Sequence, residues 1–86
     1  MGQLVTSGNT EWLDIYAAIG KPAGTPLHIQ NQGSGVAFMR ADRAPAGDKT
    51  GRKVLPDQEV ENDEGDAACL AWSNGGVRLF VQVRKV

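Results

Sequence analysis

The chain has 86 residues, which is enough for one domain and too few for two. Nine Lys and Arg residues against ten Asp and Glu residues give a formal net charge of −1, which argues against a nucleic-acid binder, because such proteins neutralise phosphates with a basic surface. A single cysteine excludes an intrachain disulfide, and no apolar run reaches the roughly 18 residues of a membrane span. A domain of this size has a thin core, so association with further copies is the remaining source of stability.

Residues 1–9 are mostly small and polar, and they predict a flexible N-terminal arm in front of a single β-rich domain over residues 10–86. In an assembly protein such an arm can reach a neighbouring subunit. Simple fraying of the chain end explains the same composition.

The segment Thr10–Ile19 has the pattern of a short amphipathic helix. Asn9 or Thr10 can cap its start, and Gly20 can supply the left-handed stop. A strand with alternating faces over residues 12–16 is the competing interpretation. The apolar residues of the helical face are spaced by three, four and seven positions: Trp12, Ile15, Tyr16 and Ile19.

After Gly20 the pattern changes to short apolar alternations separated by turn residues, which is typical of β-strands. A strand over residues 27–30 and another over residues 36–40 flank Asn31–Gly35, which we expect to form a hairpin turn. The second strand can bury Phe38 on one side and Met39 on the other.

The next segment, Asp42–Arg52, is a polar loop rich in Gly and Pro, and its eleven residues make it long for a compact domain. Short strands are expected over residues 53–55 and 58–61. The acidic residues around the second of these, over residues 57–66, do not match the spacing of a calcium-binding loop, so we expect a solvated acidic edge and no metal.

The last two strands are expected over residues 67–73 and 77–83, joined by a type I′ hairpin turn at Ser73–Gly76. The pairing of these two strands should be fixed, because a slip by one residue would expose the apolar face of the last strand. Phe80 falls on the polar face of that strand. It must pack under the N-terminal helix or be covered by another subunit.

The sum is a mainly β fold: a small β-barrel or β-sandwich of five to six antiparallel strands with one short N-terminal helix. No arrangement of nucleophile, base and orienting group is evident, so an enzyme is not expected, and no cofactor is implied. Cys69 is expected to be a buried thiol and His28 a surface residue. The aromatic residues Trp12, Tyr16 and Trp72 are expected in the core.

Trp12 and Tyr16 form a W-x-x-x-Y motif that leads into a G-T-x-L-x-I-Q-N-x-G strand over residues 24–33. Together with later pieces, among them Leu70–Ser73, this arrangement resembles the small virion structural proteins of tailed bacteriophages, those that decorate the capsid or serve at the head-tail junction. The similarity spans about residues 10–83. The loop Asp42–Arg52 and an acidic segment, Gln58–Asp66, carry more charge than that pattern.

The resemblance implies a non-enzymatic, multi-copy virion component that is made in the host cytoplasm. It would bind capsid, portal, neck or tail proteins, tail-fibre attachment included, and associate with itself, without a membrane or nucleic-acid partner. A host-glycan-binding module is the alternative, with Trp12, Trp72 and the acidic edge lining a groove. The residues expected to contact partners are Gln3, Leu4, Val5, Asn31, Gln32, Arg43, Arg52 and Phe80.

Overall fold

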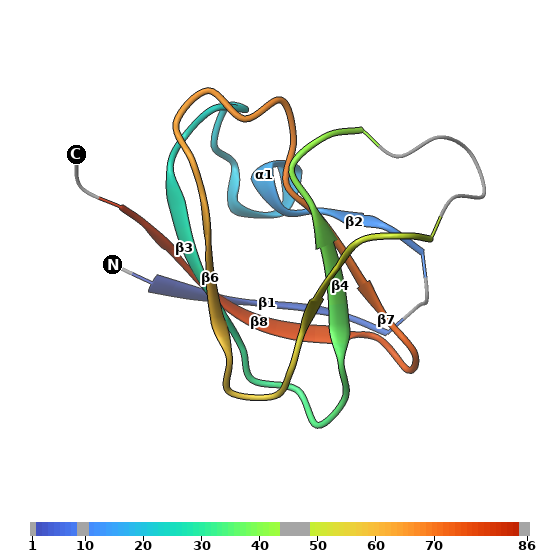
Figure 1. Cartoon of the computed structure of the whole chain (residues 1–86). Helices are drawn as coiled ribbons and strands as arrows, with labels where there is room; N and C mark the ends of the chain where they lie inside the picture. The colour runs from blue at the N-terminus through green and yellow to red at the C-terminus, as the bar shows by residue number, and fades with distance from the viewer. Residues whose placement is uncertain (1, 9–10, 44–48, 85–86) are drawn as a thin grey trace.

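The computed structural model describes residues 2–8, 11–43 and 49–84, and within them the chain forms eight strands and one short helix. The strands make two four-stranded antiparallel sheets that face each other (Figure 1). Sheet A has the order β1-β8-β3-β6, and sheet B has the order β2-β7-β4-β5. The elements are β1 (Gly2–Ser7), β2 (Leu13–Asp14), α1 (Ile15–Ile19), β3 (Leu27–Asn31), β4 (Ala37–Arg40), β5 (Arg52–Val54), β6 (Glu59–Asn62), β7 (Leu70–Ser73) and β8 (Val77–Val83).

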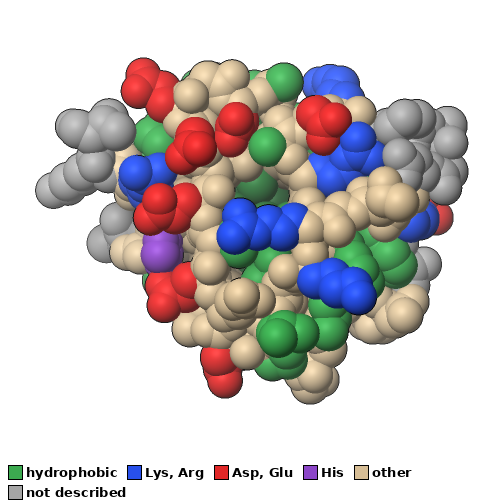
Figure 2. All heavy atoms as spheres, in the orientation of Figure 1, with side chains coloured by type: hydrophobic (Ala, Val, Ile, Leu, Met, Phe, Trp, Pro, Cys, Tyr) green, Lys and Arg blue, Asp and Glu red, His purple; other side chains and the backbone are tan. Residues whose placement is uncertain are grey.

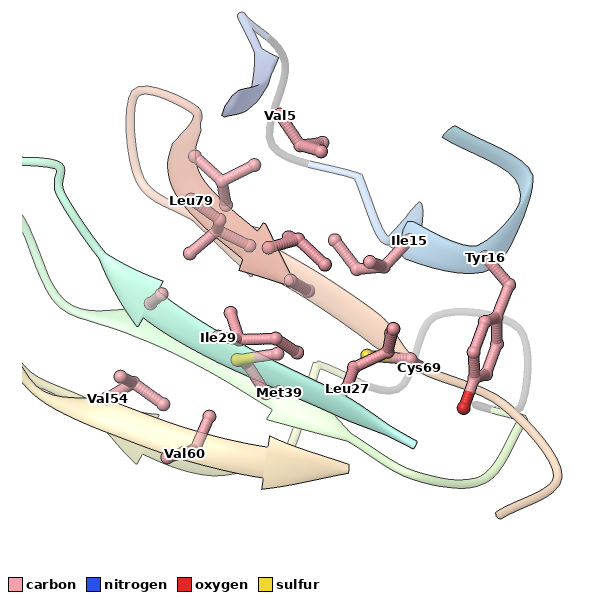
Figure 3. Close-up of a cluster of buried hydrophobic side chains, with 14 residues drawn as sticks. Val5, Ile15, Tyr16, Leu27, Ile29, Met39, Val54, Val60, Cys69 and Leu79 are labelled. Carbon is pink, nitrogen blue, oxygen red and sulfur yellow. The ribbon is translucent and has the colours of Figure 1, made fainter. Parts of the chain in front are cut away.

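The core lies between the two sheets because each strand turns its apolar alternate residues inward. Sheet A contributes Leu27 and Ile29 of β3 and Leu79 of β8, and sheet B contributes Met39 of β4. Ile15 of α1 joins the same cluster, as Figure 3 shows, so the helix packs against the core.

The predicted mainly β fold is confirmed, but a closed barrel is wrong. The strands divide into two separate sheets, with edges at β1 and β6 in sheet A and at β2 and β5 in sheet B. The predicted five to six strands are too few, because β1 and the two-residue β2 arise where the sequence predicts an arm and a helix.

The prediction of a flexible N-terminal arm is wrong for residues 2–7, which form β1 and pair antiparallel with β8. The pairing satisfies backbone groups along an edge of β8 that no other strand covers. Val5 of this strand is 5% exposed and belongs to the core. The two ends of the predicted arm, Met1 and Asn9, lie outside the described residues.

The position of Phe80 explains why a glycine stands at the start of β1. A Cβ built on Gly2 would lie 1.9 Å from Cζ of Phe80, so the aromatic ring lies directly over this glycine. An aromatic ring placed over a neighbouring glycine shields backbone that has no side chain of its own. Of the two positions expected for Phe80, packing under the helix is therefore wrong, and cover by another subunit stays a prediction.

The helix is shorter than predicted. It begins after Asp14, whose Oδ1 accepts a hydrogen bond from the Ala17 amide at 3.2 Å, and it ends at Gly20 with φ 70°, as predicted. The preceding Leu13 and Asp14 pair with β7 instead, and this tertiary pairing outweighs the helical pattern. The predicted caps Asn9 and Thr10 lie in a segment that the structure does not describe.

Neither predicted hairpin exists, because residues 31–35 and 73–76 each carry the chain from one sheet to the other. β8 pairs with β1 and β3, whereas β7 pairs with β2 and β4. The Gly76 amide donates to the Ser73 carbonyl at 3.0 Å, and of the two central residues only Gly75 has a positive φ, 85°. The turn is therefore of type II rather than type I′.

The turn generates the first prediction. Gly75→Ala should lower the free energy of unfolding by about 1–2 kcal/mol, because alanine at this positive φ carries the left-handed penalty. Gly76→Ala should lower it by roughly 3 kcal/mol or more, because its Cβ would also lie 2.0 Å from the Ser7 carbonyl oxygen. Urea unfolding of both variants checks the difference, and equal losses would contradict it.

Candidate interaction surfaces

The outer face of sheet A brings together three segments that are far apart in the sequence. Leu4 of β1 lies opposite Phe80 of β8, which in turn lies opposite Gln30 of β3. Residues that face each other across adjacent strands share one side of the sheet. The Gln32 side chain reaches the same side, because its Nε2 donates to Oε1 of Gln30 at 3.1 Å. Three of the predicted contact residues, Leu4, Gln32 and Phe80, therefore lie on this one face.

Leu4 is the exposed apolar residue of this face, and it lies on the edge strand β1. Leu4 is 45% exposed, while Phe80 beside it is half-buried. Gln3, the neighbouring predicted contact residue, is also exposed, but it lies opposite Val81 and its side chain points to the other side of the sheet. This face therefore presents an exposed leucine beside a half-buried phenylalanine, with the side-chain amides of Gln30 and Gln32 on the same side.

A polar groove of about 760 Å³ lies at one end of this face, beside two of the connections between the sheets, residues 31–35 and 73–76. Gln30, Gln32 and Arg78 line it, with Asp57 and Asn74 from the adjoining turns. The sequence prediction omits Gln30 and Arg78, although strand alternation places them on the same side as Gln32 and Phe80. The groove can offer hydrogen bonds to a polar partner.

Asp57 has an unusual backbone conformation in this groove. Its φ is 67°, and it occupies the second central position of a turn in which the Gln58 amide donates to the Leu55 carbonyl at 3.0 Å. Glycine or asparagine is the usual residue there. The Asp57 amide donates to the Asn31 carbonyl at 2.7 Å, and this contact holds the turn against β3.

The prediction of a partner contact is wrong for two residues, Asn31 and Val5, because both are buried. Asn31 is 1% exposed, and its Nδ2 donates to the carbonyls of Val54 at 2.8 Å and of Gly35 at 2.9 Å. Its Oδ1 accepts a hydrogen bond from the Gly33 amide at 2.9 Å. Asn31 thus links sheet A to sheet B inside the fold. Val5 lies in the core, so neither residue is available to a partner.

The two predicted arginines lie away from Leu4 and Phe80. Arg52 is exposed on β5 opposite Met39, at the edge of sheet B. Arg43 is exposed in the loop after β4 and lines a recess with Lys21. The predicted loop Asp42–Arg52 is described only in part, because residues 44–48 lie outside the described ranges.

The acidic edge is engaged by basic side chains. His28 contacts Glu59 through Nε2, and its Nδ1 lies 3.6 Å from Oε1 of Glu61, so the histidine sits between acidic groups (Figure 2). Nη1 of Arg84 lies 3.4 Å from Oε2 of Glu61 and 3.4 Å from Oδ1 of Asp63. Among the residues with described positions, no group of three or more His, Cys, Asp and Glu side chains is arranged to hold a metal ion.

An aromatic cluster covers the outer face of sheet B. Trp72 stacks on Phe38 with ring centroids 4.8 Å apart, and Trp12 meets it edge-on at 6.4 Å. The Trp72 Nε1 donates to the Lys49 carbonyl at 3.0 Å, which fixes the end of the long loop over the rings. The prediction of a core position is wrong for Trp12 and Trp72, because the inward alternate position of β7 belongs to Ala71.

Tyr16, the third aromatic residue predicted in the core, does lie there. The predicted groove between the tryptophans and the acidic edge does not form. Trp72 lies on β7 of sheet B and Trp12 directly precedes β2 of the same sheet, whereas Glu59 and Glu61 lie on β6 of sheet A.

Cys69 and His28 do not form a catalytic pair. Cys69 is buried in the core cluster, whereas His28 lies beside Glu59 on sheet A. Burial raises the pKa of the Cys69 thiol to about 12, and the nearby carboxylates of Asp14 and Asp66 add to the effect. A thiol with such a pKa is a poor nucleophile at neutral pH.

No protein-family model, curated protein or solved structure matches this chain. Among the described residues, no helix has the length and apolar character needed to cross a membrane.

The buried thiol generates the second prediction. At pH 8 a maleimide reagent should modify Cys69 at least about 100-fold more slowly in the folded protein than in urea, because the reaction requires opening of the core. Mass spectrometry of timed samples checks the rate, and equal rates in both states would contradict the buried position.

The raised pKa of Cys69 also implies that the stability contribution of this neutral thiol is complete below about pH 9 and is lost as the pH rises toward 12.

Proposed function

We propose that the chain is a non-enzymatic structural protein of a tailed-bacteriophage virion. It is a multi-copy auxiliary component that binds capsid, neck or tail proteins and associates with further copies of itself. The observation that carries the proposal is the convergence of Leu4, Gln32 and Phe80 on the outer face of sheet A. These residues come from three separate segments, each expected from the sequence to contact a partner.

The composition of that face supports a binding role. An exposed leucine and a half-buried phenylalanine lie beside a polar groove lined by Gln30, Gln32 and Arg78. An apolar centre with a polar surround is the usual anatomy of a protein–protein contact. The buried, poorly nucleophilic Cys69 and its separation from His28 add support for a role without catalysis. The sandwich arrangement, two facing sheets on one core, gives the face a rigid backing.

The third prediction concerns the particle. Phage particles purified from the source that encodes this chain should contain it in many copies per particle, as measured by quantitative mass spectrometry against the major capsid protein. A phage-encoded protein of DNA replication serves as the control for contamination. A copy number no higher than that of this control would contradict the proposal.

Leu4→Ser and Leu55→Ser form a matched pair for the same measurement, because the two leucines are 45% and 53% exposed. Leu55 lies after β5, outside the Leu4 and Phe80 face. We expect at least about tenfold fewer copies of the Leu4→Ser chain in particles, since a lost apolar contact costs roughly 1–2 kcal/mol. The Leu55→Ser chain should be incorporated normally.

A host-glycan-binding module is the second candidate, favoured by the aromatic cluster on sheet B. Trp12, Phe38 and Trp72 lie on the outer side of the sheet, and all three are half-buried rather than enclosed. Aromatic faces of this kind can stack on sugar rings. The cluster also holds Lys49, so a saccharide would have to share these rings with the loop.

The fourth prediction separates the two candidates. If the cluster binds a saccharide, a glycan array should give specific signals, and the same oligosaccharides should shift tryptophan fluorescence. Trp72→Phe should weaken such binding by roughly tenfold, because the smaller ring offers less stacking area. The virion proposal by itself predicts no response on the array. A specific response that Trp72→Phe weakens by this amount would move the glycan-binding function ahead.

A further inference from the structure

Three of the four sheet edges in the described part of the chain have a feature that discourages the addition of another strand. β6 carries Glu59 and Glu61, β5 carries Arg52 and Lys53, and β2 has only two residues. Charge and shortness are both means by which proteins keep an exposed edge from pairing.

The fourth edge, β1, has neither protection. Its six residues, GQLVTS, include no charged residue and no proline, and within the described ranges it pairs with β8 alone. Gln3, Leu4 and Thr6 are exposed along it. At the start of the strand, Gly2 has no side chain, and the Phe80 ring lies over it. An uncharged strand of this length at a sheet edge is a template for a further strand.

We propose that β1 pairs antiparallel with β1 of a second copy of this chain, across a two-fold axis at Leu4, so that the two A sheets become continuous. The proposal deepens the self-association within the proposed function and rests on that function only in requiring further copies. Its partner is the chain itself, and the contact is isologous.

The register follows from the faces of the strand. Directly opposed residues share one face of a sheet, so Gly2, Leu4 and Thr6 of one copy must face the same three residues of the other. With the axis at Leu4, the two Leu4 side chains meet, and each Gly2 lies opposite Thr6 of the second copy. With the axis at Val5, each Leu4 would face Thr6 instead.

The axis at Leu4 covers the apolar group that the single chain leaves exposed. Phe80 lies directly opposite Leu4 within each copy. The pairing therefore creates one apolar row that runs from Phe80 through both Leu4 side chains to Phe80 of the second copy. No like charges meet along the junction, because β1 carries none.

The fifth prediction tests the contact by the solution mass. Light scattering across a range of concentrations should show a rise from the chain mass of 9.2 kDa toward twice that value. The midpoint should change little between low and high salt, because no charges meet in the contact. A mass that stays at the single-chain value up to millimolar concentration would overturn the proposal.

Leu4→Lys and Leu55→Lys provide the matched variants. Leu4→Lys places two positive charges opposite each other at the axis and should raise the dimer dissociation constant at least about tenfold. Leu55→Lys, at an equally exposed leucine outside the strand, should leave it unchanged. Circular dichroism confirms that both variants are folded. A dimer that is insensitive to Leu4→Lys would overturn the proposal.

Cysteine cross-linking tests the register and does not depend on the lysine variant. Leu4→Cys should form an intermolecular disulfide under mild oxidation, because the Cα atoms of opposed residues lie about 4.5–5.5 Å apart, within the range that a disulfide spans. Thr6→Cys should not, because in this register the two residues at position 6 are separated along the strands. The native Cys69 is buried and should stay reduced. Cross-linking of Thr6→Cys instead of Leu4→Cys would overturn the register.

These outcomes are separate from those of the virion test. A strict monomer that is nevertheless abundant in particles would overturn the β1 pairing and leave the proposed function standing. A chain that forms a Leu4-dependent dimer but is absent from particles would support the β1 pairing and overturn the proposed function.

Discussion

The buried Asn31 side chain connects the two sheets at the point where the chain leaves sheet A. Its amide donates to the Val54 carbonyl of β5 and to the Gly35 carbonyl, and its Oδ1 accepts from the Gly33 amide. A buried amide satisfied in this way fixes the connection, because any displacement would leave polar groups without partners. The outer face of sheet A and the groove beside it both adjoin this connection.

The N-terminal strand depends on two close contacts that only glycine allows. The Phe80 ring lies over Gly2, and Gly76 lies against the Ser7 carbonyl. β1 is thereby held against β8 at both ends. Leu4 lies between these two ends of β1 and is exposed on the outer face.

The two outer faces of the molecule differ in character. On sheet B, Trp12, Phe38 and Trp72 pack on one another and hold the end of a long loop through the Lys49 carbonyl. On sheet A, the exposed Leu4 lies on an uncharged edge strand, and polar amides lie on the same face. This difference favours sheet A as the surface for protein partners. The aromatic cluster has a structural role that a ligand would have to share.

The sequence by itself determined the strand segments from residue 27 onward, the Gly20 helix stop and the buried thiol, because these follow from local alternation and backbone preference. It also indicated Leu4, Gln32 and Phe80 as contact residues. Only the tertiary structure decided which strands pair. Turn residues such as Ser73–Gly76 specify a change of direction, and whether the next strand joins the same sheet or the facing one depends on long-range packing. For the same reason the sequence could not show that Asn31 and Val5 are buried, that residues 2–7 form a strand, or that Trp12 and Trp72 face outward.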